Sequence, residues 1–217
     1  MAKRTRSKPK TAKPAGLSTA DPASHVIDVA LDLAAEKGWR DLALSDIAEA
    51  AGLSLAGLYA LYPSKAAILS AYSRSIDNAV LADLPAPGST PESAPESAKD
   101  RLFDLLMRRF DKLDAHKEGM LRIAEDTGRD PLSLVCSLAR LDRSMAAMLE
   151  AAGISAEGLG GLLKVKGLGA VYLAGLRAWF RDESEDMAKT MAALDRALSR
   201  AERLASGFGR QSKRAAA

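Results

Sequence analysis

The sequence offers few side chains that could perform catalysis or hold a metal ion. His25 and His116 are its only histidines, and neither has a histidine four residues away or a cysteine cluster beside it, as zinc sites require. Cys136 is the single cysteine, which excludes an internal disulfide, and its place beside an apolar helical stripe predicts buried packing. We therefore expect no metal site, no cofactor and no enzymatic activity.

Other polar clusters have structural explanations. The glycines between residues 158 and 161 follow no expected strand, so they do not indicate a phosphate-binding loop. The acids between residues 182 and 186 straddle the start of an expected helix, where negative charge is favourable. His25 is expected at the surface, and His116, near a helix end, is expected to interact with the terminal carbonyls.

The most informative spacing lies between residues 44 and 69, in the sequence LSDIAEAAGLSLAGLYALYPSKAAIL. Ile47, Ala48 and Ala51 form the inner face of a short helix. Gly52 provides a tight turn that a side chain would obstruct, and Leu58 anchors the next short helix. This pattern predicts two helices that cross steeply, so that the second can lie in a DNA major groove.

Positive charge is concentrated at the two ends of the chain. Residues 1–20 carry six basic side chains and residues 207–217 carry three, and neither segment contains an acid. Residues 21–83 hold nine acids and four bases, a net charge of −5, which is unfavourable beside phosphates. We expect both basic ends to be disordered, with Lys3, Arg4 and Arg6 of the first contacting DNA. A solubilising tail explains the same charge equally well.

The elements that must position these residues are all helical. Hydrophobic residues make up 47% of the chain and aromatic residues only 5%, a balance that favours helices packed through Leu, Ala and Met. Asp21 and Pro22 predict a helix start, and Gly38 predicts an αL cap at its end. Short helices follow near residues 45–51 and 55–61, and a longer helix follows Lys65.

A proline-rich segment divides the chain. It predicts a helix-turn-helix domain at residues 21–83, a Pro/Ser-rich linker at 84–97 and a larger helical domain at 98–206. Five helices are expected in the larger domain, near residues 98–116, 118–127, 131–152, 156–181 and 185–206. The last two are expected to form a dimeric four-helix bundle. Two rows of residues on the first of these recur every four positions and allow close helix approach: Gly167, Val171 and Gly175, and Ala170, Ala174 and Ala178.

The amino-terminal pattern resembles the TetR family. Its Asp-Ile-Ala helix, Ala-Gly-apolar-Ser turn, Leu-Tyr pair and Ser-Lys pair occur in order, beginning at Asp46, Ala51, Leu58 and Ser64. The resemblance implies a homodimeric, TetR-like fold that binds operator DNA through a three-helix domain and a ligand through the second domain. Two departures are Ala43, where the family usually has threonine, and Ala60-Leu61, where it has polar or aromatic residues. The residues expected to contact DNA are Ser45, Ser54, Leu55, Ala56, Gly57, Tyr59, Ala60 and Lys65.

The carboxy-terminal half also resembles ubiquinone-biosynthesis accessory proteins, which have a TetR-like fold and bind lipids or isoprenoid intermediates. The resemblance rests on residues 116–119 and on Trp179, Asp182, Ser184, Asp186, Thr190, Leu194 and Asp195. An apolar pocket lined by Met107, Phe110, Met120, Leu138, Met145, Tyr172 and Trp179 would suit such a ligand, although each is also explained as helix core.

Two functions follow from these resemblances. The first is a cytoplasmic transcriptional regulator, expected to be a repressor, that responds to a small apolar effector. The alternative is a lipid-binding accessory protein that no longer reads specific DNA. The sequence has no run of about eighteen apolar residues, so we expect no membrane span.

Overall fold

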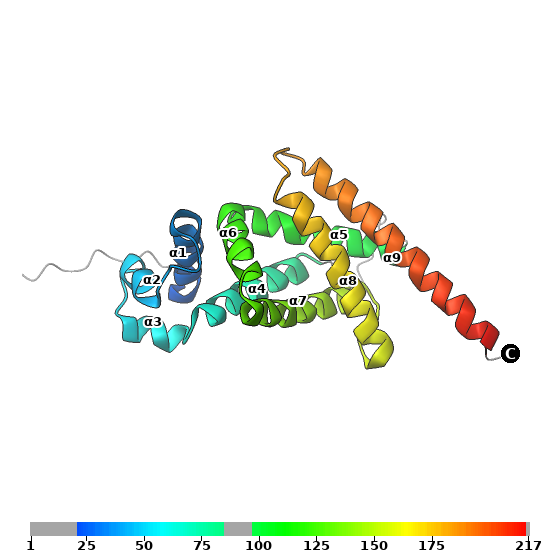
Figure 1. The fold of residues 1–217 in the computed structure, drawn as a ribbon, viewed down its shortest axis with the longest axis horizontal. Helices are drawn as coiled ribbons and strands as arrows, with labels where there is room; N and C mark the ends of the chain where they lie inside the picture. Colours follow the sequence, from blue (N-terminus) through cyan, green and yellow to red (C-terminus); the bar gives the residue numbers. More distant parts are fainter. Residues whose placement is uncertain (1–20, 85–96, 216–217) are drawn as a thin grey trace, which may run out of the picture.

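The computed structural model describes residues 21–84 and 97–215, with side chains as far as residue 205. These residues form helices without any strand, which confirms the prediction of an all-α chain. The helices are α1 (Pro22–Lys37), α2 (Leu44–Ala50), α3 (Leu55–Leu61), α4 (Lys65–Ala82), α5 (Ala98–Asp114), α6 (Lys117–Gly128), α7 (Pro131–Ala151), α8 (Gly158–Trp179) and α9 (Ala188–Ala215). Figure 1 shows α1–α3 at one end of the molecule and α8 and α9 at the other.

Short polar residues begin several of these helices, as the sequence predicts. The Asp21 carboxylate accepts a hydrogen bond from the Ala23 amide, and Pro22 occupies the first turn. The Ser54 hydroxyl accepts from the Gly57 amide at the start of α3. The αL cap expected at Gly38 is wrong, because its φ of 85° and ψ of 153° lie outside the αL region. They lie instead in a region that is open essentially to glycine alone.

The last helix is longer than expected. α9 continues through Ala215, so the tail predicted to be disordered from residue 207 is helical as far as residue 215. No proline interrupts this stretch, so nothing in the backbone forces the helix to stop at residue 206. The basic arm at residues 1–20 and most of the Pro/Ser-rich linker lie outside the described residues.

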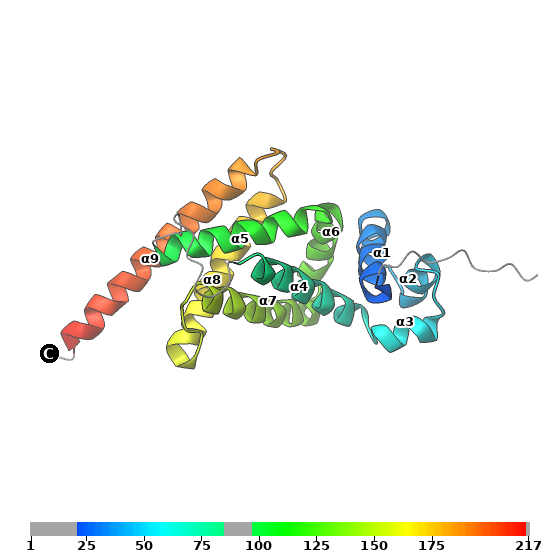
Figure 2. The ribbon, with the colours of Figure 1, turned by 180° about the vertical axis from the view of Figure 1, so that it is seen from behind.

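α4 packs against helices of both the helix-turn-helix unit (α1–α3) and the second unit (α5–α9). It begins against α1 and then runs between α5 and α7, as Figure 2 shows from behind. Asp77 in its second half forms an ion pair with Arg109 of α5, with 2.8 Å between Oδ1 and Nη1. The break between α4 and α5 therefore separates them in the chain but not in space.

The second unit has a continuous apolar core. The residues at helical spacing on one side of α5 are buried along its whole length, from Leu102 to Leu113. Phe110 stacks on Tyr172 of α8 with their ring centroids 5.2 Å apart. The expectation that Cys136 is buried is wrong, because its side chain is exposed. Leu134 and Leu138 of the neighbouring apolar stripe are themselves 42% and 39% exposed, so this part of α7 is not covered by other helices.

α8 is apolar along most of its length. By length and composition alone it could cross a membrane, since its most apolar stretch has a mean hydropathy of 1.3. In this fold 39% of that stretch is buried, against α7 and α9 among other helices. The short helices α2 and α3 would pass the same test only as one span bent by 104°.

Candidate functional site

The turn between α2 and α3 sets the geometry of the first candidate site. The two helices are bent by 104° to each other, and the Leu58 side chain anchors α3 with no exposed surface. Gly52 in the turn has a φ of 68°, and a Cβ there would meet nothing within 4 Å. The backbone conformation, and not the lack of space that the sequence suggested, therefore favours glycine at this position.

The outer face of α3 is exposed and almost entirely apolar. Leu55 is 52% exposed and Tyr59 is 59% exposed, and Ala56 and Ala60 are exposed beside them. Ser45 is exposed at the start of α2, as the sequence-based assignment to DNA requires. Tyr59 carries the one hydrogen-bonding side chain within α3, so this face can contact a groove mainly through its shape and apolar surface.

Two of the residues expected to contact DNA already have partners within the chain. The Lys65 ammonium group donates to the carbonyls of Trp39 and Leu42, both at 2.6 Å, and also lies 5.2 Å from the centre of the Trp39 ring. Burial lowers the pKa of Lys65. A phosphate contact would require Lys65 to leave these carbonyls. The Ser54 hydroxyl caps α3, although it remains exposed.

Ala43 changes how α2 begins. Its methyl group cannot cap the helix, and the Asp46 carboxylate instead accepts a hydrogen bond of 2.9 Å from the Ala43 amide. The start of α2 therefore lacks a side-chain hydroxyl that could bind a phosphate oxygen at this residue.

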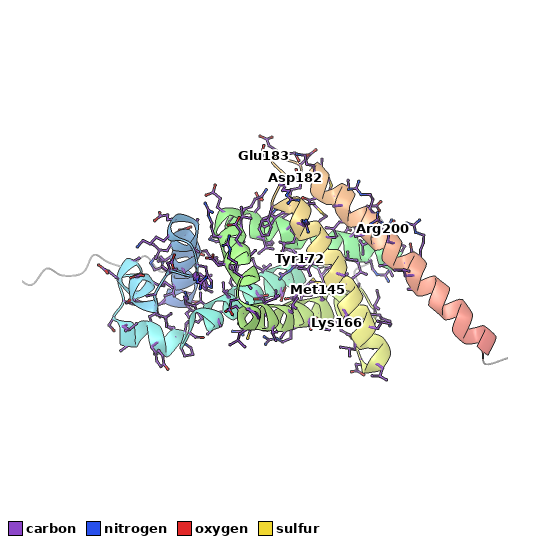
Figure 3. The ribbon with its side chains drawn as sticks, in the orientation of Figure 1. Met145, Lys166, Tyr172, Asp182, Glu183 and Arg200 are labelled. Carbon is purple, nitrogen blue, oxygen red and sulfur yellow. The ribbon has the colours of Figure 1, made fainter. Side chains whose placement is uncertain are left out.

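The second candidate site is a half-open cavity of about 270 Å³ lined by α4, α5, α6, α7 and α8. Of the residues predicted to line a pocket, Met120, Leu138 and Tyr172 do so. Phe110, Met145 and Trp179 do not, because they are fully buried in the core, and Met107 also lies outside the cavity lining. Figure 3 labels Tyr172 near the middle of α8.

The cavity lining also contains two arginines that the sequence-based pocket did not include. Arg109 is 4% exposed and pairs with Asp77, whose other oxygen accepts a hydrogen bond of 2.5 Å from the Ser144 hydroxyl. Arg140 is half-buried, and its Nη2 donates to the Ser137 hydroxyl at 2.6 Å. Arg109 stands among apolar residues at helical spacing on α5, and this position is a signal that the sequence offers. The sequence pattern does not single out Arg140.

α6 connects this cavity to the helix-turn-helix unit. One side of α6 lines the cavity through Met120 and Ile123, and the helix also packs against α1. A Cβ at Gly119 would lie 2.4 Å from the Leu31 carbonyl oxygen, so the α1–α6 approach requires glycine there. The Asp126 carboxylate accepts a hydrogen bond of 2.9 Å from the Arg40 amide, which lowers the pKa of Asp126.

His116 lies in the same interface. Its Nδ1 is 3.3 Å from the Tyr72 hydroxyl, and its Nε2 is 3.6 Å from Asp28 of α1. The expected interaction with helix-terminal carbonyls is therefore wrong, since the ring bridges side chains of α4 and α1. Sequence alone does not bring these residues together, because they are far apart in the chain.

Several residues behind the second resemblance join the α5–α6 turn to the α8–α9 turn. Lys117 donates to the Asp182 carbonyl at 2.5 Å, and its ammonium lies 5.3 Å from the centre of the Trp179 ring. The buried Asp182 carboxylate accepts hydrogen bonds from Ser184 and from the amide and hydroxyl of Thr190. Burial alone would raise the pKa of Asp182, but these hydrogen bonds hold it well below its ordinary value. Figure 3 marks Asp182 at this turn.

The two small-residue rows on α8 do not divide cleanly between its outer and inner sides. Ala170 and Ala174 of one row and Gly167 of the other are exposed, and Leu159 and Leu163 continue the same side of the helix with 88% and 71% exposure. Val171 and Gly175 are buried within the protomer. A Cβ at Gly175 would lie 3.1 Å from Leu194 of α9, so that glycine serves packing within the chain.

Comparisons with known proteins agree with this geometry. Residues 26–72 match the family model described as bacterial regulatory proteins, tetR family. A TetR transcriptional regulator from Nitrosomonas europaea is similar over 84% of this chain and 99% of its own, with 25% identity and a TM-score of 0.65. A search of curated proteins found no match.

Two further solved structures share the fold at lower identity. A TetR transcriptional regulator from Rhodococcus sp. RHA1 has a TM-score of 0.58 and 19% identity over 83% of this chain and 94% of its own. A tetR-family regulator from Streptomyces coelicolor has a TM-score of 0.54 and 16% identity over 86% of this chain and 85% of its own.

Proposed function

We propose that this protein is a homodimeric regulator that represses transcription until a small effector binds. Residues 26–72 match the tetR family model, and 84% of the chain shares the fold of a TetR transcriptional regulator. The observation that carries this proposal is α6, a single helix that both lines the cavity and packs on the DNA-binding unit. A ligand that moves α6 changes the position of α1, and with it that of α3.

Operator contact is assigned to α3 and to the basic arm together. The exposed face of α3 supplies Tyr59 and an apolar surface able to meet thymine methyl groups. Residues 21–83 carry a net charge of −5, so most of the attraction to phosphates must come from residues 1–20. This division predicts modest sequence preference and a strong dependence of affinity on salt.

The exposed side of α8 supports the dimer. Small and apolar residues from Leu159 to Ala174 form one continuous face at the end of the molecule opposite α3 (Figure 1). In analytical ultracentrifugation, Ala170→Glu should shift the protein to monomers, because a charge would be buried in the interface. Ala139→Glu, at an exposed position on α7, is the matched control and should leave the dimer intact. A dimer that survives Ala170→Glu contradicts this interface.

The function is tested by selecting genomic DNA fragments with the purified full-length protein at physiological salt. The regulator should enrich a palindromic motif, and Tyr59→Ala should weaken binding to that motif by roughly 1–3 kcal/mol. Deleting residues 1–20 should weaken binding to all sequences and reduce its salt dependence. Enrichment of no sequence would refute the regulator.

The exposed face of α3 has only the Tyr59 hydroxyl to hydrogen-bond with bases, and this favours a second candidate function. A chain that kept the fold and lost operator recognition would act as a lipid-binding accessory protein, with the cavity as its site. Native mass spectrometry of the purified protein separates the two, because the accessory protein should carry a lipid in most preparations. A cavity that is repeatedly empty contradicts this candidate.

A further inference from the structure

The cavity between α4 and α8 has a charge imbalance that indicates the class of its ligand. Two guanidinium groups line it, those of Arg109 and Arg140, and its described lining contains no carboxylate. The remaining lining is largely aliphatic, with Leu113, Ile123 and Leu141 among its members. An apolar cavity with a few polar groups is the usual form of a small-molecule site.

The positive charge of Arg109 is already compensated. Asp77 lies 2.8 Å from its Nη1, and Ser144 donates to the same carboxylate from the other side. The guanidinium also lies 5.3 Å from the centre of the Tyr172 ring. Its buried Nε has no hydrogen-bond partner among the described residues. Because Asp77 balances its charge, Arg109 adds no net charge to the cavity.

The charge of Arg140 is not compensated. Among the described residues its hydrogen-bond partner is the neutral Ser137 hydroxyl, and no carboxylate of that part of the chain forms an ion pair with it. The side chain is half-buried, and burial lowers the pKa of Arg140. The cavity therefore carries a net charge of about +1 in a partly dehydrated setting, where an ion pair is stronger than in water.

We propose that the effector is a small amphipathic carboxylate whose acid group pairs with Arg140 and whose apolar body lies against the aliphatic wall of the cavity. Ser137 orients the guanidinium by accepting from Nη2, which leaves its other N–H groups free for a bidentate contact with the carboxylate. A volume of about 270 Å³ lies below the usual range of roughly 300–1,000 Å³ for ligand sites, which favours a short chain or a single ring. This inference rests on the proposed role of the cavity as the effector site.

The test compares carboxylates with alcohols of equal length. Hexanoate, octanoate and decanoate, each beside its alcohol, are titrated into the full-length protein by calorimetry in the absence of DNA. At least one carboxylate should bind about tenfold or more tightly than its alcohol, the ratio that a charge-assisted contact supplies. Arg140→Gln should abolish this preference while alcohol binding persists, and Arg140→Lys should retain part of it.

Arg143→Gln is the matched control, because Arg143 is exposed one turn further along α7 and lies outside the cavity lining. It should leave the preference unchanged. Equal binding of acid and alcohol, a preference that survives Arg140→Gln, or no binding by any member of the series overturns the proposal. Because no DNA is present, a negative result here leaves the DNA-binding function untouched, and failure of the DNA selection leaves this result interpretable.

Discussion

Gly119 is the position where a single methyl group should have the clearest effect on this protein. It lies in the first turn of α6, directly against the backbone of α1, and a Cβ there would be 2.4 Å from the Leu31 carbonyl oxygen. Both atoms belong to rigid parts of the structure, so no side-chain rotation can relieve the overlap. The helices must move apart in Gly119→Ala.

The size of the effect follows from this distance. The separation must grow by roughly 0.9 Å to reach the ~3.3 Å of close carbon–oxygen contacts. Overpacking of this kind costs about 1–3 kcal/mol. Replacing glycine by alanine inside a helix returns about 0.5–1 kcal/mol. We therefore expect Gly119→Ala to lower the free energy of unfolding by up to about 2.5 kcal/mol.

Urea denaturation followed by circular dichroism measures this change. Gly128→Ala is the matched control, because it ends the same helix and a Cβ there would meet nothing within 4 Å. The control should be as stable as the unmodified protein or slightly more stable. If Gly119→Ala is no less stable than Gly128→Ala, α1 and α6 do not pack as described, and the proposed route from the cavity to the DNA-binding unit fails with them.

Three further substitutions test buried contacts, each by urea denaturation. Lys65→Met leaves backbone carbonyls of the α1–α2 loop without their donor and should cost about 1–3 kcal/mol, so an unchanged midpoint would contradict this role. Asp182→Asn should cost about 1.5–3 kcal/mol at pH 7, whereas the exposed neighbour Glu183→Gln should cost nothing measurable. The pKa of Asp182 in the folded protein lies below its unfolded value of about 3.9. Its contribution to the free energy of unfolding is therefore present above pH ~3.9 and should fade as the pH falls through the folded pKa. A stability difference between Asp182→Asn and the unmodified protein that does not change with pH would contradict this. Asp77→Asn leaves the charge of Arg109 buried without its partner and should lower the free energy of unfolding by about 3–5 kcal/mol. A variant as stable as the unmodified protein would contradict this role of the ion pair.

The parts of this fold that depend on neighbours in the chain were predictable. The turn at Gly52, the anchor at Leu58 and the cap at Ser54 act within a few residues, so their types and spacing predict the helix-turn-helix. The buried stripe of α5 was equally clear, because apolar residues at helical spacing leave one face for the core.

The roles of single polar residues were less predictable. Lys65 follows the turn pattern of a DNA-binding domain, yet Trp39 and Leu42 bring their carbonyls to its ammonium from more than twenty residues away. The net charge at the cavity likewise depends on Asp77 meeting Arg109 across two helices. The sequence shows which residues are present, but it does not show which of them lie close together in the folded chain.

The sequence by itself determined that the chain is helical, where most helices begin, and that α3 presents an apolar face. Only the tertiary structure decided which sides of α7 and α8 face the core, the cavity or solvent, because α8 is apolar nearly all round and its residue types do not distinguish these sides. It also decided that α6 connects the cavity to α1, since that contact requires two helices to meet at a glycine that the helical pattern does not single out.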